Sequence, residues 1–82
     1  MAKAVLTREL GQRFTDGQLE FQIECRSVRD LIRQLDAQFP GIGEQLMNGM
    51  SAAINGVIHE DAYLEPLDET SEVYFLPAIG GG

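Results

Sequence analysis

The sequence has little cysteine, few basic side chains and no long hydrophobic run. Cys25 is its one cysteine, so the chain forms no internal disulfide and builds no zinc site from cysteine alone. No apolar run approaches the roughly 20 residues that a membrane helix needs, and the first residues lack the apolar stretch of a secretory signal. We therefore expect a soluble protein of the cytoplasm, where a single thiol stays reduced.

Basic residues are outnumbered, with 6 Lys and Arg against 13 Asp and Glu, which gives a net charge of −7. This balance argues against binding to nucleic acid or to an anionic membrane, which needs clustered cations, and it favours a basic protein partner. The hydrophobic share of 44% is typical of a chain with a packed core. With 82 residues, the chain forms one small domain that is too small to enclose a deep catalytic cavity.

The first third of the chain is predicted to form a hairpin. The apolar residues 4–6 indicate a first strand, and the polar segment 11–17, with the turn signal Asp16-Gly17, is expected to connect it to the next. In residues 19–25 apolar and polar side chains alternate, which is typical of a half-buried strand. Cys25 continues the apolar side of that strand, and we expect it to be a buried packing residue.

The period then changes to that of a helix, which we predict over 27–38. Val28, Leu31, Ile32 and Leu35 form one apolar stripe. Ser27 is the expected N-cap, and the Phe39-Pro40-Gly41 segment is expected to end the helix because a residue before proline avoids helical angles. Residues 42–48 are predicted to form a second short helix or a turn.

The remaining residues predict further strands. Asn55-Gly56 between apolar runs indicates a hairpin, 63–64 a short strand or loop, and 72–76 a last strand. In that strand Val73 and Phe75 are expected to face the core, and Tyr74 and Leu76 the other side. The order predicts an α+β domain over 1–77, with a mixed sheet of four to five strands packed on one main helix.

Residues 78–82 are predicted to form a flexible tail that ends in three glycines, Gly80, Gly81 and Gly82. The six residues from Pro77 onward reach at most about 20 Å when extended, enough to thread a narrow channel in another protein. The carboxylate of Gly82 is not shielded by a side chain. ATP can activate such a carboxylate as an acyl-adenylate, which a sulfur or nitrogen nucleophile then attacks. The other reading is a loose terminus without function.

These features together resemble the MoaD/ThiS family of ubiquitin-like sulfur carriers, which have the β-grasp fold. The matching segments are the helix over 27–38, the Phe39-Pro40-Gly41-Ile42 segment, the Ile54-Asn55-Gly56 turn and the last strand followed by proline and the terminal glycines. They cover most of the chain. One departure is Gly80, which occupies a position that varies in the family and is expected to make the tail more flexible.

The resemblance implies a carrier and not an enzyme. A ubiquitin-activating-type enzyme, which uses ATP and magnesium, would adenylate Gly82, and this chain would bind no cofactor. A sulfur donor protein of the cysteine desulfurase or rhodanese type would then give a thiocarboxylate. A synthase subunit would accept its sulfur for molybdopterin, the thiazole of thiamin, cysteine or a similar product. Gly80 and Gly81 would thread the partner's channel. Tyr74, Leu76, Pro77 and Ile79 would provide docking contacts near the tail.

Two other functions remain open at this point. One is a protein modifier joined through Gly82 to lysines of target proteins. The other is a β-grasp interaction module that never uses its terminus. Within the carrier reading, a stable complex with a larger protein would indicate the small subunit of molybdopterin synthase.

Two groups of polar residues carry weaker predictions. His59, Glu60 and Asp61 could suggest a metal site, but neighbouring strand residues point to opposite faces, so we expect no metal here and a solvent-facing histidine. The carboxylates of the C-terminal half are expected to be solvated and to steer the chain toward a basic activating enzyme. They are Glu60, Asp61, Glu65, Asp68, Glu69 and Glu72.

Overall fold

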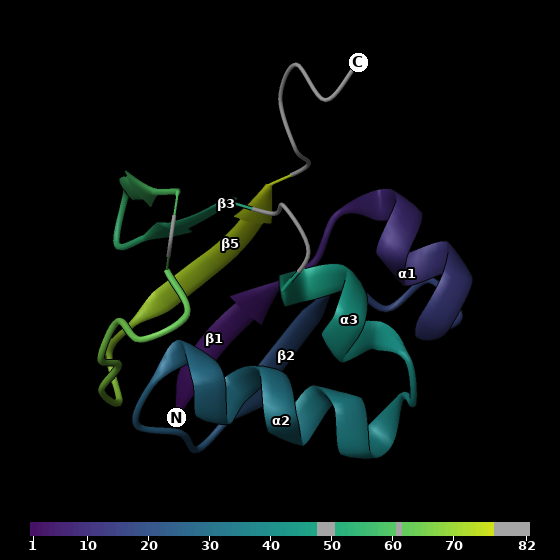
Figure 1. Cartoon of the computed structure of the whole chain (residues 1–82), viewed down its shortest axis with the longest axis horizontal. Helices are drawn as coiled ribbons and strands as arrows, with labels where there is room; N and C mark the ends of the chain where they lie inside the picture. The colour runs from purple at the N-terminus through teal and green to yellow at the C-terminus, as the bar shows by residue number, and fades with distance from the viewer. Residues whose placement is uncertain (48–50, 61, 77–82) are drawn as a thin grey trace.

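A computed structural model describes residues 1–47, 51–60 and 62–76, and they form one five-stranded mixed sheet with three helices (Figure 1). The strands are β1 (Ala2–Val5), β2 (Glu20–Ile23), β3 (Ser51–Ile54), β4 (Val57–His59) and β5 (Glu72–Leu76). Their order in the sheet is β2-β1-β5-β3-β4. β1 and β5 are parallel, and the other neighbouring pairs are antiparallel. The predicted α+β architecture is confirmed.

The connection between β1 and β2 differs from the prediction. Residues expected to form a polar turn contain a helix, α1 (Arg8–Phe14), so the first two strands are not joined by a simple hairpin turn. Thr7 caps this helix, since its hydroxyl oxygen accepts a 3.2 Å hydrogen bond from the Leu10 backbone N–H. Gly11 obscured the helix in the sequence because glycine is a poor helix former, but here it lies close to the end of the Leu19 side chain. A methyl group at Gly11 would overlap the side chain of Leu19.

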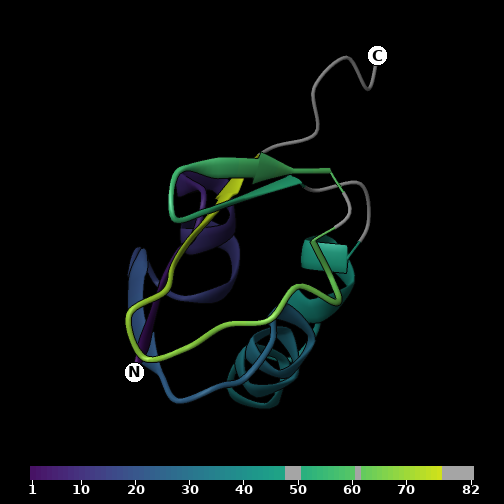
Figure 2. The same cartoon turned by 90° about the vertical axis from the view of Figure 1, so that its left-hand side faces the viewer.

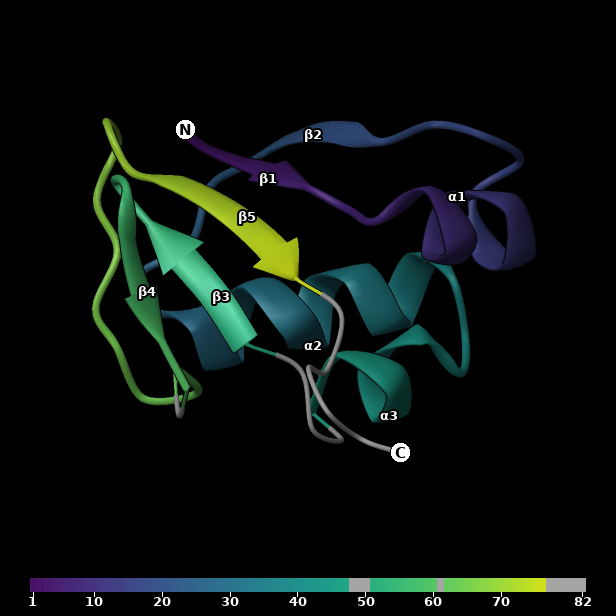
Figure 3. The ribbon, with the colours of Figure 1, turned by 90° about the horizontal axis from the view of Figure 1, so that it is seen from above.

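The main helix forms as predicted and lies across one face of the sheet (Figures 1 and 3). It is α2 (Val28–Gln38), and the Ser27 side chain accepts a 3.1 Å hydrogen bond from the Asp30 backbone N–H. Its stripe of Val28, Leu31, Ile32 and Leu35 is buried. The helix ends at Phe39, where the chain enters the predicted stop segment.

A short third helix, α3 (Ile42–Met47), follows the stop segment and confirms the expectation of a helix or turn there. Asp36 of α2 holds the two helices together. Its Oδ1 accepts hydrogen bonds from the backbone N–H groups of Gly41 and Gly43, at 3.1 and 3.0 Å. The carboxylate therefore fixes the corner between α2 and α3.

The hairpin of β3 and β4 also forms as predicted. Asn55 and Gly56 have φ values of 50° and 85°, the left-handed conformation that a two-residue turn of this kind requires. Tyr63 and Leu64 lie in a turn and not in a strand. The loop that contains them is held against the start of α2, since the Val28 N–H donates to the Glu65 carbonyl at 3.0 Å.

The core lies between the sheet and the helices, and Figure 2 shows the sheet edge-on beside them. On β5, Val73 and Phe75 are buried while Tyr74 is exposed, so the predicted alternation is confirmed. None of the described helices has the length and apolar character needed to cross a bilayer. The expected boundary between residues 77 and 78 lies outside the described residues.

Candidate functional site

The face of the sheet opposite the main helix carries a continuous row of apolar side chains that crosses four of the five strands. The register pairs Glu20 with Val5, Val5 with Tyr74, Tyr74 with Ala53 and Ala53 with Ile58. We call Val5, Tyr74, Ala53 and Ile58 the open-face row. Residues paired in this way lie on the same face of a sheet, so the row forms one apolar band.

The exposure of the row indicates a surface that is free to contact another protein. Ile58 is 65% exposed and Tyr74 is 40% exposed, while Val5 and Ala53 are half-buried between their neighbours. Leu76 lies two residues after Tyr74 on β5, opposite Ser51, and is also half-buried. Apolar side chains that adjoin one another at a surface are typical of interaction sites.

The structure therefore brings the two predicted docking residues of β5, Tyr74 and Leu76, onto one face. The sequence did not reveal that Val5, Ala53 and Ile58 join them, because strand order and register are decided by pairings between distant segments. The other predicted site residues, Pro77, Ile79, Gly80, Gly81 and Gly82, lie outside the described residues.

Charged groups adjoin the apolar row at the end of the sheet where β5 begins. Lys3 is paired with Glu72 in the register, and its Nζ lies 3.3 Å from Glu20 Oε1. The hydrogen bond and the negative charge of Glu20 raise the pKa of Lys3 above its ordinary value. The row thus runs between an ion pair at its β1–β2 side and the apolar Ile58 on β4.

The turn before β5 is ordered by a carboxylate. Asp68 Oδ1 accepts hydrogen bonds from the Thr70 hydroxyl at 2.7 Å and from the Thr70 backbone N–H at 2.8 Å. These bonds lower the pKa of Asp68 because they stabilise its charged form. Asp68 therefore positions the start of β5, and it has a structural role beyond the general negative charge predicted for this segment.

Cys25 is buried in the core, as predicted from its place in the alternating pattern. Burial, with a smaller contribution from Asp30, raises the pKa of its thiol. A thiol that is buried and hard to deprotonate is a poor nucleophile. The structure thus supports a packing role for Cys25.

His59 was expected to face solvent, but its side chain is half-buried. Its Nδ1 lies 3.5 Å from Glu65 Oε1, in the loop that follows β4. No three His, Cys, Asp or Glu side chains within the described part of the chain are grouped as a metal site would require. Glu60 is exposed, and Asp61 lies outside the described residues.

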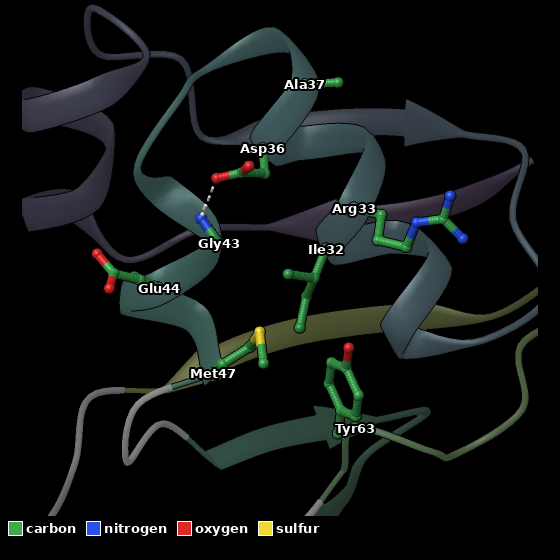
Figure 4. A pocket seen from close by; sticks show the side chains of 8 residues that line it. All are labelled: Ile32, Arg33, Asp36, Ala37, Gly43, Glu44, Met47 and Tyr63. Carbon is green, nitrogen blue, oxygen red and sulfur yellow. Dashed lines mark hydrogen bonds between the residues drawn. The ribbon is translucent and has the colours of Figure 1, made fainter.

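An open groove of about 430 Å³ lies beside the helices (Figure 4). α2, α3 and the loop after β4 line it with Ile32, Arg33, Asp36, Ala37, Gly43, Glu44, Met47 and Tyr63. Figure 4 shows Arg33 at one side and Asp36 and Glu44 at the other, with Met47 and Tyr63 along the lower edge. The sequence did not predict this groove, because it depends on the angle at which α3 packs on α2. Asp36 uses Oδ1 to hold α3 in place.

The model of the ThiS family matches residues 7–82. This chain belongs to the ThiS family. The resemblance to the MoaD/ThiS sulfur carriers that the sequence suggested is thereby confirmed, and the match includes the terminal glycines. A comparison with curated proteins finds no match.

Solved structures confirm the β-grasp fold predicted for this ThiS-family chain. A chain of the Amycolatopsis orientalis BexX/CysO complex has a TM-score of 0.85 at 16% identity, and all of both chains is covered. Mycobacterium tuberculosis CysO, an antigen, has a TM-score of 0.82 at 19% identity over 96% of this chain and 100% of that one. The small archaeal modifier protein 1 of Methanosarcina acetivorans has a TM-score of 0.79 at 20% identity, over 99% of this chain and 95% of that one. At these identities the likeness establishes the fold alone.

Proposed function

We propose that this protein carries sulfur as a thiocarboxylate on Gly82. The observation that carries the proposal is the family match, because it extends through the last residue and so includes the three terminal glycines. The side chains of the described domain support a passive role for the domain itself. Its cysteine is buried and its histidine is paired with Glu65, so neither is placed as a catalytic group in an open pocket.

The proposed chemistry takes place on partner proteins. A carboxylate oxygen of Gly82 attacks the α-phosphorus of ATP, and pyrophosphate leaves. The persulfide sulfur of a donor protein then attacks the acyl carbon and AMP leaves, which gives an acyl disulfide with the donor cysteine. A further thiol then attacks the sulfur of that cysteine and forms a disulfide with it, and the thiocarboxylate leaves with the electron pair of the broken S–S bond. ATP and magnesium are held by the activating enzyme, and this chain is its co-substrate. The sulfur passes to a synthase subunit for molybdopterin, thiamin or a similar product, in the cytoplasm.

The open-face row is the proposed docking surface for these partners. Leu76 lies two residues beyond Tyr74 of this row and is the last described residue before Pro77, Ile79 and the terminal glycines. A partner that covers Tyr74 and Ile58 would hold the domain where the chain leaves the sheet. The fold occurs in a BexX/CysO complex, which supports docking of such a domain on another protein. The net charge of −7 favours a partner with a basic rim.

The intact mass of the protein tests the carrier proposal. The chain is incubated with a candidate activating enzyme, ATP and sulfide. The expected result is a mass gain equal to the exchange of one oxygen for sulfur, lost when ATP is omitted or Gly82 is deleted. A variant that keeps Gly82 but carries Leu64→Ala, an exposed residue outside the row, serves as the matched control and should gain the same mass.

Other outcomes distinguish the alternatives. A mass gain that matches a lysine-linked protein, stable to denaturation and reduction, would identify a protein modifier joined through Gly82. Unimpaired function in cells after removal of Gly81 and Gly82 would contradict the carrier role and identify an interaction module.

A further inference from the structure

The chain has one lysine, Lys3, although it has six basic residues. The other five are arginines: Arg8, Arg13, Arg26, Arg29 and Arg33. This difference matters for a protein with an activated C-terminus. A neutral lysine amine attacks an activated acyl group, whereas an arginine guanidinium keeps its proton and is no nucleophile at neutral pH. Replacing lysine by arginine retains the positive charge and removes the competing amine.

The one lysine is also restrained. Its Nζ lies 3.3 Å from Glu20 Oε1, and its side chain is 29% exposed. The neighbours of Lys3 in the register are Gln22 on β2 and Glu72 on β5, so a second carboxylate lies on the adjacent strand. Both carboxylates favour the protonated amine, and they agree with a raised pKa for Lys3.

The position of Lys3 further separates it from the end of β5. Because β1 and β5 are parallel, Lys3 lies opposite Glu72, four residues before Leu76. Four strand residues span about 13 Å. The backbone of Lys3 therefore lies toward the end of the sheet away from the point where the chain leaves β5.

We propose that the near-absence of lysine, together with the Lys3–Glu20 ion pair, protects the activated Gly82 from attack by lysine amines of other copies of this chain. This inference rests on the proposed carrier function. It also specifies that Lys3 is the one side chain through which copies of the protein could become joined to each other by an isopeptide bond.

The reaction that is suppressed can be written in full. A Lys3 ammonium first loses a proton to solvent, and the neutral nitrogen attacks the acyl carbon of Gly82. The C–N bond forms as the C–S bond of a thioester, or the C–O bond of an acyl-adenylate, breaks. The thiolate or AMP leaves, and the attacking nitrogen releases its second proton to solvent. The product is an isopeptide-linked dimer.

The reactivity of Lys3 is tested first, with the acetyl ester of N-hydroxysuccinimide as the probe. Peptide mapping by mass spectrometry gives the acetylation rate of Lys3 relative to the α-amine of Met1. Glu20→Gln should raise the relative rate about two- to fivefold, the range expected for loss of an exposed ion pair. Glu9→Gln removes the carboxylate of the Arg13–Glu9 pair and should leave the rate unchanged. Equal rates in wild type and Glu20→Gln would overturn the role of the ion pair.

Protection of the C-terminus is tested with a chemically prepared Gly82 thioester of mercaptoethanesulfonate, which needs no activating enzyme. The wild-type thioester should hydrolyse without forming lysine-linked dimers. Arg29→Lys/Arg33→Lys adds two exposed amines without changing net charge and should form dimers that resist hydroxylamine. Peptide mapping separates lysine-linked dimers from those joined through the Met1 α-amine. The proposal is wrong if lysine-linked dimers form as fast in the wild type, or if the variant forms none. Because no enzyme is used, failure here is distinct from failure of the carrier proposal.

Discussion

At the scale of single residues, short polar side chains decide where elements begin. Ser27 is the clearest case, because the pattern of residues 27–38 predicted it as the N-cap and the structure confirms the bond from the Asp30 N–H. The apolar residues that follow Ser27 in α2 pack into the core and so hold the helix that the cap begins. Leu31 and Leu35 are 0% exposed, so the start of the helix and the core are fixed by neighbouring residues.

Ser27→Ala is expected to lower the free energy of unfolding by about 1 kcal/mol, because it leaves an N-terminal N–H of α2 without its acceptor. Chemical denaturation monitored by circular dichroism measures the change. Ser27→Asp retains an acceptor at this position and should remain close to wild type. If Ser27→Ala and Ser27→Asp lower the free energy of unfolding equally, the Ser27 hydroxyl does not act as the N-cap acceptor.

Asp68 gives a pH-dependent prediction. Its pKa in the folded protein lies below the ordinary value of 3.8, so its bonds to Thr70 contribute stability above that value. The contribution is lost as the pH falls through the lowered pKa. Thr70→Val should move the pKa of Asp68 upward, as measured by NMR titration of its carboxyl carbon. Thr70→Ser keeps the hydroxyl and should leave the titration of Asp68 unchanged. If the pKa of Asp68 is the same in Thr70→Val as in the wild type, the Thr70 hydroxyl does not lower it.

At the scale of elements, the sequence predicted those that have a strong pattern and missed one that does not. The stripe of α2 and the Asn55-Gly56 turn follow from local rules, since each depends on neighbouring residues. α1 was missed because Gly11 looked like part of a turn. Its packing against Leu19 is a tertiary contact that a local pattern does not contain.

The corner between α2 and α3 provides a prediction at this scale. Asp36→Ala removes the acceptor shared by the N–H groups of Gly41 and Gly43 and should destabilise the protein by about 1 kcal/mol. Asp36→Asn retains a side-chain oxygen as acceptor and should destabilise the protein less than Asp36→Ala. Thermal unfolding measures both changes, and hydrogen exchange at Gly43 should increase in Asp36→Ala. Unchanged exchange at Gly43 would show that α3 is held by other contacts.

At the scale of the whole molecule, the sheet separates a buried face from an open one. The buried face was predictable from the alternation of Val73 and Phe75. The open-face row was not, because Val5, Tyr74, Ala53 and Ile58 come from four segments that only the sheet places side by side. A docking surface on this fold is thus a property of the register.

The row predicts a matched pair of effects on sulfur loading in the mass assay. Ile58→Arg places a charge in the apolar row and should slow the gain of sulfur at least about tenfold, the order of a lost contact worth 1.4 kcal/mol. Leu64→Arg places the same charge at a residue that is 75% exposed and outside the row, and should have little effect. Circular dichroism should show both variants folded. Equal rates would exclude the row as the docking surface.

The sequence alone determined the elements that depend on neighbouring residues, and its terminal glycines suggested the chemistry that we propose. The cap and stripe of α2, the hairpin turn and the inward residues of β5 required no distant contact to predict. The tertiary structure alone decided the strand order, the helix at Gly11, the groove beside α3 and the pairing of Lys3 with Glu20. Each of these depends on contacts between different elements, and the packing of the whole core decides which elements meet.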